Sequence, residues 1–326
     1  SKIDPWFLCQ IKEIVDCEIN LKKVGLPKNF TEFNRIKSIG FSDKKLSELT
    51  NLSEDVVRKK RTALKILPVY KKVDTCAAEF KSFTPYMYST YQRNFSIVSE
   101  CEAEPTGKKK IIILGGGPNR IGQGIEFDYC CCQASFSLKD AGFETIMVNC
   151  NPETVSTDYD TSDRLYFEPL KEEFVFNIIK KEQMNGNLIG IIAQFGGQTP
   201  IKLAKFLHQN KLPILGTQYS SIDLAEDRDR FRNLLNKLKL KQAESGIAKT
   251  YKEAIKIADK IGLPLMVRPS YVLGGRAMEI VHEKNQLKKF VEEAFKAAEE
   301  NPILIDKFID HAMEVDVDAI SDGKQV

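Results

Sequence analysis

The sequence has 326 residues, which is enough for two or three domains because a domain usually holds about 100 to 200 residues. Apolar and aromatic residues make up 42% and charged residues 29%, a globular mixture that excludes wholesale disorder, collagen and a coiled coil. The formal net charge of +3 is too small to indicate nucleic-acid binding by itself.

The composition also argues against membranes, secretion and metal-binding cysteines. The longest apolar runs, such as Leu188 to Ala193, are much shorter than the about 20 residues that a membrane-spanning helix needs. Asp4 near the start disfavours a secretory signal. The eight cysteines form no Cys-x-x-Cys pair, and the run from Cys130 to Cys132 is interpreted as part of a packed helix wall. We therefore expect a cytoplasmic protein without a membrane segment.

The first hundred residues predict short helices separated by capping signals. Four apolar residues share one face of a first helix: Trp6, Ile11, Ile14 and Val15. Capping patterns predict helix starts at Asn29, Ser42 and Asn51, and a helix end at Gly40. We expect an all-helical domain over residues 1–105.

Between residues 96 and 110 the apolar pattern gives way to Ser, Glu, Pro, Thr, Gly and Lys, the composition of a connector. Beyond it, short β-branched runs alternate with helical stretches. The predicted strands are residues 111–114, 145–148, 188–192 and 213–215. The predicted helices are residues 126–140, 171–183 and 199–209. Strands that are buried on both faces have this pattern, which predicts a parallel sheet of βαβ units over residues 106–220.

From residue 221 to residue 326 the pattern changes again, to a charged amphipathic helix followed by alternating strands and helices. Helices are predicted over residues 223–238 and 284–299. Strands are predicted over residues 263–268, 278–282, 303–309 and 314–320. We expect a third domain of which this sequence holds a part.

A glycine-rich segment, Gly115 to Gly124, follows a predicted strand and precedes a predicted helix, where a helix N-terminus can bind phosphate. It fails as a dinucleotide-binding fingerprint because its sixth position is Arg120. The next strand also ends in Asn149, Cys150 and Asn151, without the acidic residue that would bind a ribose. A tight turn that merely connects the strand to the helix is the alternative.

A second segment brings a cation close to a pair of glycines. Arg268 precedes Gly274 and Gly275, and another strand is predicted from Met278. Adjacent glycines let backbone N–H groups approach phosphate oxygens, so the pattern favours a hairpin that covers phosphates. The sequence contains no Walker-type loop.

Acidic residues alternate with valines near the end of the sequence. The alternation places Glu314, Asp316 and Asp318 on one face of a predicted strand. This face is either a solvated sheet edge or a set of carboxylates that could bind ribose hydroxyls. The three histidines are not placed beside a Ser or Cys, which disfavours hydrolysis by a catalytic triad.

Helices predicted over residues 42–49 and 53–67 could form a helix-turn-helix, because the second carries the basic run Arg58 to Arg61. Glu54 and Asp55 lie at the start of this helix, where base-contacting residues would be. A solvated helix face is therefore the alternative, and it is favoured.

Several long strings closely resemble the large subunit of carbamoyl phosphate synthetase. They are residues 73–80 with 86–91, ILGGGPNRIGQGIEFDYCC from Ile113, and LMVRPSYVLGGRAMEIV from Leu265. Residues 149–158 and 194–200 also resemble this family. The resemblance runs nearly end to end and matches the second half of that subunit.

The resemblance implies an α + α/β multidomain fold: a helical oligomerisation domain over residues 1–105, a Rossmann-like pre-ATP-grasp domain over 106–220 and a truncated ATP-grasp domain over 221–326. The family makes carbamoyl phosphate for arginine and pyrimidine biosynthesis from bicarbonate, glutamine-derived ammonia and two ATP, and its second half phosphorylates carbamate. The implied partners are the glutaminase small subunit, the rest of the large subunit and further copies of the chain.

The resemblance also implies roles for individual residues. Arg228 and Arg268 are expected to contact phosphate or the transferred group, work that suits cations in phosphoryl transfer. The other residues implied at the nucleotide are Gly274 and Gly275 over the phosphates, Lys307 and Ile309 at adenine, and Glu314 at the ribose. Glu126 and Glu153 are expected to line the passage by which carbamate arrives.

The family's ligands for Mg²⁺ or Mn²⁺ are expected beyond Val326, so we expect weak or absent activity from this chain alone. Two alternatives remain. One is another carboxylate-phosphorylating ATP-grasp ligase, such as biotin carboxylase. The other is a noncatalytic assembly or nucleic-acid-binding module.

Overall fold

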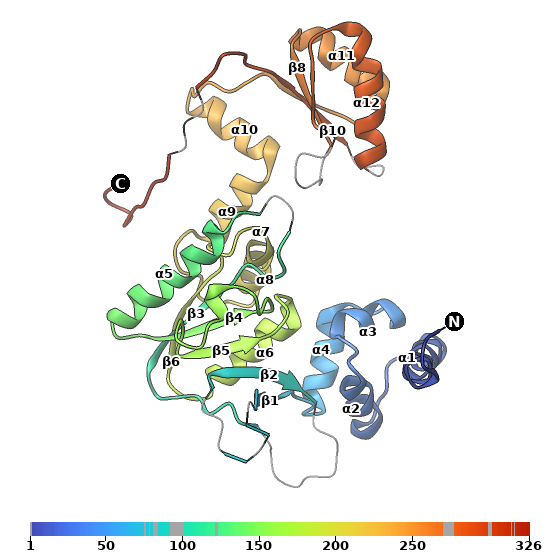
Figure 1. Ribbon diagram of the computed structural model, residues 1–326, viewed down its shortest axis with the longest axis vertical. Helices are drawn as coiled ribbons and strands as arrows, with labels where there is room; N and C mark the ends of the chain where they lie inside the picture. The colour runs from blue at the N-terminus through green and yellow to red at the C-terminus, as the bar shows by residue number, and fades with distance from the viewer. Residues whose placement is uncertain are drawn as a thin grey trace. The chain divides into compact units, whose positions relative to one another are not determined.

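The computed structural model describes residues 2–74, 76–77, 79–80, 84–91, 101–120, 123–269, 277–298, 302–313, 315 and 317–326. The chain forms two compact units (Figure 1). The first contains Ser1–Asn119 and Gly124–Glu226, and the second contains Arg120–Gln123 and Asp227–Val326. Among the described residues, no helix combines the length and the apolar character needed to cross a bilayer.

The first unit begins with four helices: α1 (Pro5–Val24), α2 (Phe30–Ile39), α3 (Asp43–Thr50) and α4 (Glu54–Ala63). The predicted caps are confirmed at Asn29 and Ser42, whose side chains accept backbone N–H groups, and Gly40 ends α2 with φ 109°. The predicted start at Asn51 is wrong. Asn51 ends α3 with φ 53°, a conformation that asparagine tolerates, and Ser53 caps α4 instead.

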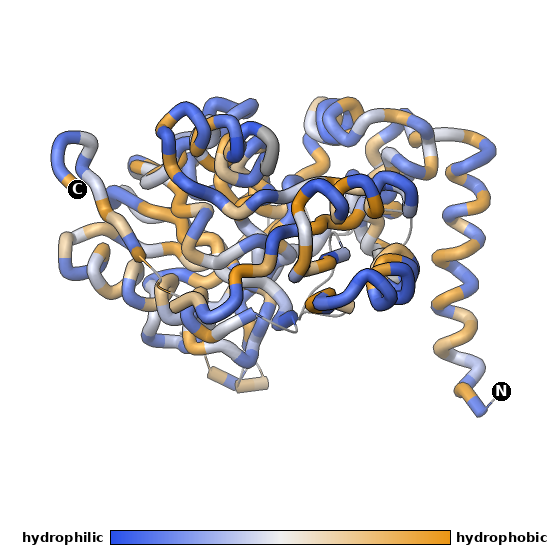
Figure 2. The backbone as a smooth tube through the Cα atoms, turned by 90° about the horizontal axis from the view of Figure 1, so that it is seen from above, coloured by the Kyte–Doolittle hydropathy of each residue, from blue (hydrophilic) through white to orange (hydrophobic). Residues whose placement is uncertain are grey.

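Helix α1 carries the predicted apolar face, but most of that face is not covered. Trp6 is 62% exposed and Ile11 is 56% exposed. Of the twenty residues of α1, two are buried, Cys17 and Leu21, and they pack into the core of the helical region. Figure 2 shows hydrophobic residues along the whole length of this helix. Most of the apolar face of α1 is therefore exposed in the described part of the first unit.

A six-stranded sheet follows, in the order β1-β2-β5-β4-β3-β6. Its strands are β1 (Val69–Lys72), β2 (Tyr86–Thr90), β3 (Lys109–Leu114), β4 (Glu144–Asn149), β5 (Arg164–Phe167) and β6 (Asn187–Ile192). β1 runs antiparallel to β2 and the other pairs are parallel, which confirms the predicted parallel sheet.

Two parts of the strand prediction are wrong. The first hundred residues are not all helical, because the short strands β1 and β2 add to the sheet through β5. Residues 213–215 form a single bridge, between Ile214 and Ile191, in place of the predicted strand. Strands of four or five residues take much of their stability from their neighbours, which local sequence does not reveal.

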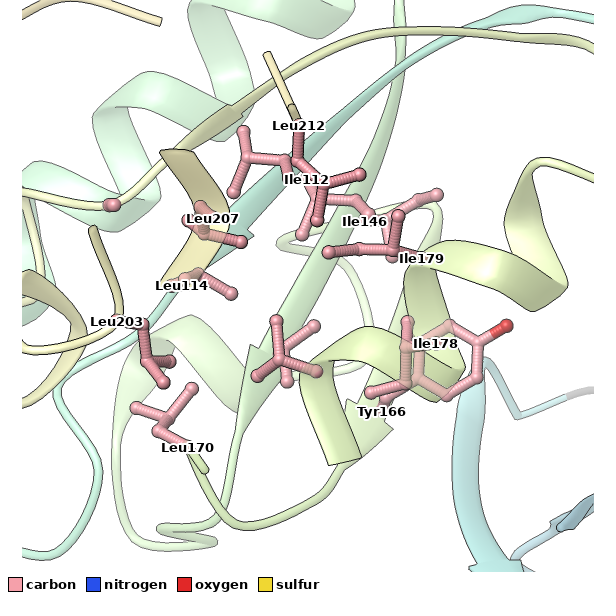
Figure 3. Close-up of a cluster of buried hydrophobic side chains, with 14 of the residues drawn as sticks. Ile112, Leu114, Ile146, Tyr166, Leu170, Ile178, Ile179, Leu203, Leu207 and Leu212 are labelled. Atoms are coloured by element: carbon pink, nitrogen blue, oxygen red, sulfur yellow. The ribbon is translucent and has the colours of Figure 1, made fainter. Parts of the chain in front are cut away.

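Helices cover both faces of the sheet. Alternate residues of β3, β4 and β5 pack against α6 (Glu172–Glu182) and α8 (Ala204–Gln209) on one face (Figure 3). Ile113, Met147 and Leu165 pack with Cys131 of α5 (Glu126–Asp140) on the other face. The predicted helix over residues 126–140 is confirmed.

Two other predicted helices are divided. Residues 199–209 form α7 (Gln198–Ile201) and α8, and residues 223–238 form α9 (Tyr219–Glu226) and α10 (Arg228–Lys237). The second break has a clear cause. Asp227 has an extended backbone, and its side chain accepts the N–H of Arg230, so it ends one helix and caps the next.

The second unit is built on a four-stranded antiparallel sheet, in the order β7-β10-β8-β9. The strands are β7 (Ser245–Ala248), β8 (Leu265–Pro269), β9 (Glu279–Val281) and β10 (Ile303–Lys307), and one face packs on α11 (Tyr251–Ile261) and α12 (Lys284–Ala298). The strand predicted over residues 314–320 is wrong for the residues described there. Val315, Val317 and Ile320 lie outside any strand and are at least 70% exposed.

Candidate functional site

The glycine-rich segment lies at the carboxyl edge of the parallel sheet, where β3 is flanked by β4 on one side and β6 on the other. In open α/β sheets this reversal of strand order is the usual place for a ligand site. The segment packs against the loop that follows β6. A Cβ on Gly196 would lie 2.4 Å from the Gly115 carbonyl oxygen, so the two loops touch backbone to backbone. These glycines therefore serve close packing between loops.

Asn149, the last residue of β4, fills the space beside the glycine-rich segment. Its Oδ1 accepts the N–H groups of Gly117 at 3.0 Å and Cys150 at 2.9 Å. A Cβ on Gly115 would lie 2.6 Å from its Nδ2. Where a dinucleotide fold holds an acid for ribose, this chain has a buried amide that fixes the turn. The geometry favours the connecting-turn interpretation of the segment.

The two predicted passage residues, Glu126 and Glu153, lie beside this edge and are exposed. Glu126 is the first residue of α5, and its carboxylate folds over Gly124, where a Cβ would lie 1.8 Å from Oε2. Glu153 lies on the loop between β4 and a short 3-10 turn, Val155–Thr157, and its N–H donates to Asn151 Oδ1 at 3.0 Å. Both residues are exposed to solvent.

Sequence reasoning did not identify Asp128, which lies two residues beyond Glu126 on α5. Its Oδ2 accepts the N–H of Ser156 at 3.0 Å. Its Oδ1 is buried without a hydrogen-bond partner among the residues that the structure describes. The only sequence signal was its place in the first turn of a helix, where acids are common for a different reason.

The three cysteines of α5 differ in their access to solvent. Cys131 and Cys132 are buried, whereas Cys130 is exposed. Burial raises the pKa of Cys132 to about 12, and the charge of Asp128 adds to the effect. The pKa of Cys131 is raised still further by the same causes. The predicted packing role is confirmed for these two thiols, while Cys130 points to solvent.

Arg268 is the predicted site residue that the structure places most clearly. It lies on β8 between residues that alternate in and out of the core: Val267 packs toward α11 and α12, so Arg268 projects from the opposite face. Its NH2 lies 2.7 Å from Oδ2 of Asp306 on β10. Its Nε is buried without a hydrogen-bond partner among the described residues. A guanidinium held at one end keeps donors for a second anion.

Lys307 lies on the other face of β10. Its Nζ donates to the carbonyl oxygens of Gly262 at 3.1 Å and Leu263 at 2.6 Å, and so caps the end of α11. The backbone N–H of Lys307 donates to the Glu244 carbonyl oxygen at 2.8 Å, so both the amine and the backbone N–H have partners within the unit. Ile309 follows the strand and is 61% exposed.

The remaining predicted residues fall outside the described part of the chain. Gly274, Gly275 and Glu314 are not among the described residues, and nothing is described of the side chain of Arg228, which begins α10. Among the described residues there is no group of three or more His, Cys, Asp or Glu side chains that could hold a metal ion. The ligands for Mg²⁺ or Mn²⁺ were expected beyond Val326, and that expectation remains a prediction.

The basic run of α4 is not a free surface. Arg61 is 1% exposed and forms an ion pair with Asp43, NH2 to Oδ2 at 2.9 Å. Arg58 packs over the rings of Phe176 and Phe206, 5.1 Å from each centroid. Two of the four basic residues are thus enclosed within the same unit, Arg58 against α6 and α8 and Arg61 against α3. This burial contradicts the helix-turn-helix interpretation of α3 and α4.

Comparisons with known proteins agree on one family. Three family models match the chain: carbamoyl-phosphate synthetase large chain, oligomerisation domain (residues 1–65), carbamoyl phosphate synthase preATP-grasp domain (107–224), and carbamoyl-phosphate synthase L chain, ATP binding domain (227–326). The large chain of Rhizobium meliloti is 54% identical over 346 residues and that of Pasteurella multocida 56% over 327, each covering 100% of this chain.

The chain belongs to the carbamoyl phosphate synthase large-chain family. This confirms the resemblance seen in the sequence. The chain spans about 30% of the length of these two relatives. A biotin carboxylase domain from Hydrogenobacter thermophilus, solved with MgADP, ADP and bicarbonate, is 22% identical with a TM-score of 0.47, covering 62% of this chain and 45% of that one.

The family membership gives each part of the fold a name. The helical region contains the oligomerisation domain, the parallel-sheet region is the preATP-grasp domain, and the second unit belongs to the ATP-binding domain. Arg268 and Asp306 therefore lie within the ATP-binding domain of a carbamoyl phosphate synthase large chain, whereas Glu126, Asp128 and Glu153 lie within its preATP-grasp domain.

Proposed function

We propose that this chain contributes to the phosphorylation of carbamate by ATP, in the second half of a carbamoyl phosphate synthase large chain. The proposal rests on the position of Arg268 in the second unit. It projects from the face of its sheet opposite α11 and α12, is tied to Asp306 at one end, and precedes the glycine pair within a family ATP-binding domain. We propose domain bounds of residues 1–105, 106–220 and 221–326.

The proposed reaction is an in-line phosphoryl transfer. A carbamate oxygen attacks the γ-phosphorus of ATP, the bond to the β–γ bridging oxygen breaks, and carbamoyl phosphate and ADP form. Charge spreads over the γ-phosphoryl oxygens, so a preorganised cation stabilises the transition state. Arg268 supplies that charge, and Arg228 is proposed to contact the phosphates with it. Because the described residues do not form a metal site, no step is assigned to Mg²⁺ or Mn²⁺ here.

The other site residues bind the nucleotide and admit carbamate. We assign Gly274 and Gly275 to the phosphates, Lys307 and Ile309 to adenine, and Glu314 to the ribose. Both carboxylates at the edge of the preATP-grasp sheet, Glu126 and Glu153, are exposed and are proposed to line the carbamate passage.

The proposed partners are those that would supply ammonia and carbamate to this reaction. A glutaminase small subunit would supply ammonia, and the rest of the large chain would convert bicarbonate and ammonia to carbamate. The exposed apolar face of α1 supports a further protein contact, which we assign to a homo-oligomer. We place the enzyme in the cytoplasm, in arginine and pyrimidine biosynthesis.

The proposal is tested with Arg268→Ala in a full-length large chain, by assaying ATP synthesis from carbamoyl phosphate and ADP. Loss of a single positioned donor is expected to reduce turnover about 100-fold to 1,000-fold. Lys284→Ala is the matched control, because this exposed cation pairs with Asp259 across the helices that cover the other face. The proposal is wrong if Arg268→Ala keeps the turnover of Lys284→Ala. Fold integrity is checked by circular dichroism.

A further inference from the structure

The loop that carries Glu153 is tied to β4 and α5 at Ser156, and to the glycine-rich segment through Asn151, whose Nδ2 donates to Asn119 Oδ1 at 3.0 Å. Asn149 Nδ2 donates to the Ser156 hydroxyl at 3.2 Å, and Asp128 Oδ2 accepts the Ser156 N–H at 3.0 Å. Ser156 is fully buried and Asn149 is 1% exposed. We call Asp128, Asn149 and Ser156 the Ser156 anchor.

The anchor joins three segments that end at the same sheet edge. Asn149 also accepts the N–H of Gly117, which fixes the glycine-rich segment after β3. Asp128 belongs to α5, two residues beyond Glu126, and Glu153 lies three residues before Ser156. The anchor therefore fixes the backbone that carries Glu153 relative to the helix that carries Glu126.

Among the described residues, one hydrogen bond is found for the carboxylate of Asp128. Ser156 is its hydrogen-bond partner through Oδ2, and Oδ1 is buried without a partner among the described residues. A half-buried carboxylate with one buried oxygen that lacks a partner is unfavourable for folding, so a residue of this kind in a native structure needs an explanation. The bond to the Glu153 loop supplies one.

We propose that Asp128 is a positioning residue for the carbamate passage, acting through the Ser156 anchor to hold Glu153 opposite Glu126. This inference rests on the proposed function. Carbamate decomposes in water to bicarbonate and ammonia, so a passage must exclude solvent while it conducts. If the Glu153 loop moves away, carbamate escapes, and ATP spent on its synthesis is not recovered as carbamoyl phosphate.

The experiment measures ADP formed per carbamoyl phosphate in a full-length large chain with its glutaminase partner. Asp128→Ala removes the bond to Ser156, and a lost hydrogen bond is expected to raise this ratio up to about fivefold. Asp128→Asn is the matched control. It keeps an oxygen for the Ser156 N–H and loses no other partner, so its ratio is expected to stay near that of the unaltered enzyme.

A second readout separates positioning from general damage. ATP synthesis from carbamoyl phosphate and ADP uses the nucleotide site but not the passage, so Asp128→Ala is expected to retain it. If Asp128→Ala does not fold, Ser156→Ala tests the other tie, with a smaller rise in the ratio expected. An unchanged ratio in the variant that folds, or an equal rise in Asp128→Asn, overturns the inference.

The assignment of the passage residues is tested separately from the role of Asp128. Glu126→Gln and Glu153→Gln change the proposed passage residues directly. If both keep the normal ratio, the passage assignment under the proposed function is wrong. If they raise the ratio and Asp128→Ala does not, the passage assignment stands and the role of Asp128 is wrong.

Discussion

Two ion-pair groups in this chain show how burial separates structural charges from charges that are available for chemistry. In the first unit, Lys37, Asp43, Arg61 and Glu173 form a network in which each side chain is at most 3% exposed. In the second unit, Arg268 and Asp306 form one ion pair with side chains 40% and 19% exposed. The first group is enclosed by protein, and the second keeps access to solvent.

The buried network joins the helical region to the parallel sheet. Lys37 Nζ lies 3.0 Å from Asp43 Oδ1 and 2.6 Å from Oε1 of Glu173, at the start of α6. The Tyr91 hydroxyl donates to Glu173 at 3.0 Å. Burial and the charge of Glu173 raise the pKa of Tyr91 well above its ordinary value, so the phenol stays protonated and remains a donor. Each charge is compensated, which leaves nothing to bind a ligand.

We expect the largest effect from a substitution in the buried network. Asp43→Asn removes one negative charge from two buried cations, and it is expected to lower the free energy of unfolding by about 3 to 5 kcal/mol. Urea denaturation of the chain measures the change. Glu48→Gln is the control, because Glu48 pairs with Lys44 on the exposed side of the same helix. A loss no larger than that of the control would contradict the structural role of the network.

The same kind of substitution in the pair of Arg268 and Asp306 is expected to affect turnover more than stability. Asp306→Asn should lower the free energy of unfolding by about 1 kcal/mol, less than Asp43→Asn does, because this ion pair keeps access to solvent and such pairs contribute little to stability. If Asp306 orients Arg268, turnover in the full-length large chain should fall about tenfold while the KM for ATP changes less.

The outcome for Asp306 separates orientation from binding. A rise in KM with normal turnover would show that Asp306 contributes to nucleotide binding and does not orient Arg268. A large loss of stability would show instead that the pair is structural, like the network around Asp43. Either result would break the contrast between the two units.

The sequence predicted the elements that carry strong local signals. β3, β4 and β6 are continuous β-branched runs, and α5 begins and ends at the predicted residues. It missed β5, whose four residues RLYF contain an arginine and gain their place by pairing with β4. Its domain bounds remain predictions. Long, buried and regular segments could therefore be recognised, and short segments that depend on neighbours could not.

For the candidate site, too, the sequence revealed some residues and not others. Arg268 could be identified because it precedes a glycine pair, but its partner could not. Asp306 reaches it across the β8–β10 register, in which Leu304 lies opposite Arg268, and that register is a property of the folded sheet. The bond from the Gly117 N–H to Asn149 and the bond from the Ser156 N–H to Asp128 were likewise hidden, because they join residues 32 and 28 positions apart along the chain. Contacts of this kind arise only after the strands have paired.

The smallest effect is expected for two thiols of α5 that lie two residues apart. Cys130 is exposed and Cys132 is buried, with a pKa raised to about 12. At pH 8 an ordinary thiol of pKa about 8.5 is roughly one quarter ionised, whereas a thiol of pKa about 12 is ionised about once in ten thousand. Because the thiolate is the reactive form, iodoacetamide is expected to label Cys130 well before Cys132.

The labelling is followed residue by residue by mass spectrometry, with all eight cysteines labelled in denaturant as the control. The raised pKa of Cys132 means that the fold favours the protonated thiol. Its contribution to stability is complete below the unfolded pKa near about 8.5 and is lost as the pH rises toward 12. Equal labelling rates for Cys130 and Cys132 at pH 8 would show that the wall of α5 opens to solvent, and that burial does not separate the two kinds of group there.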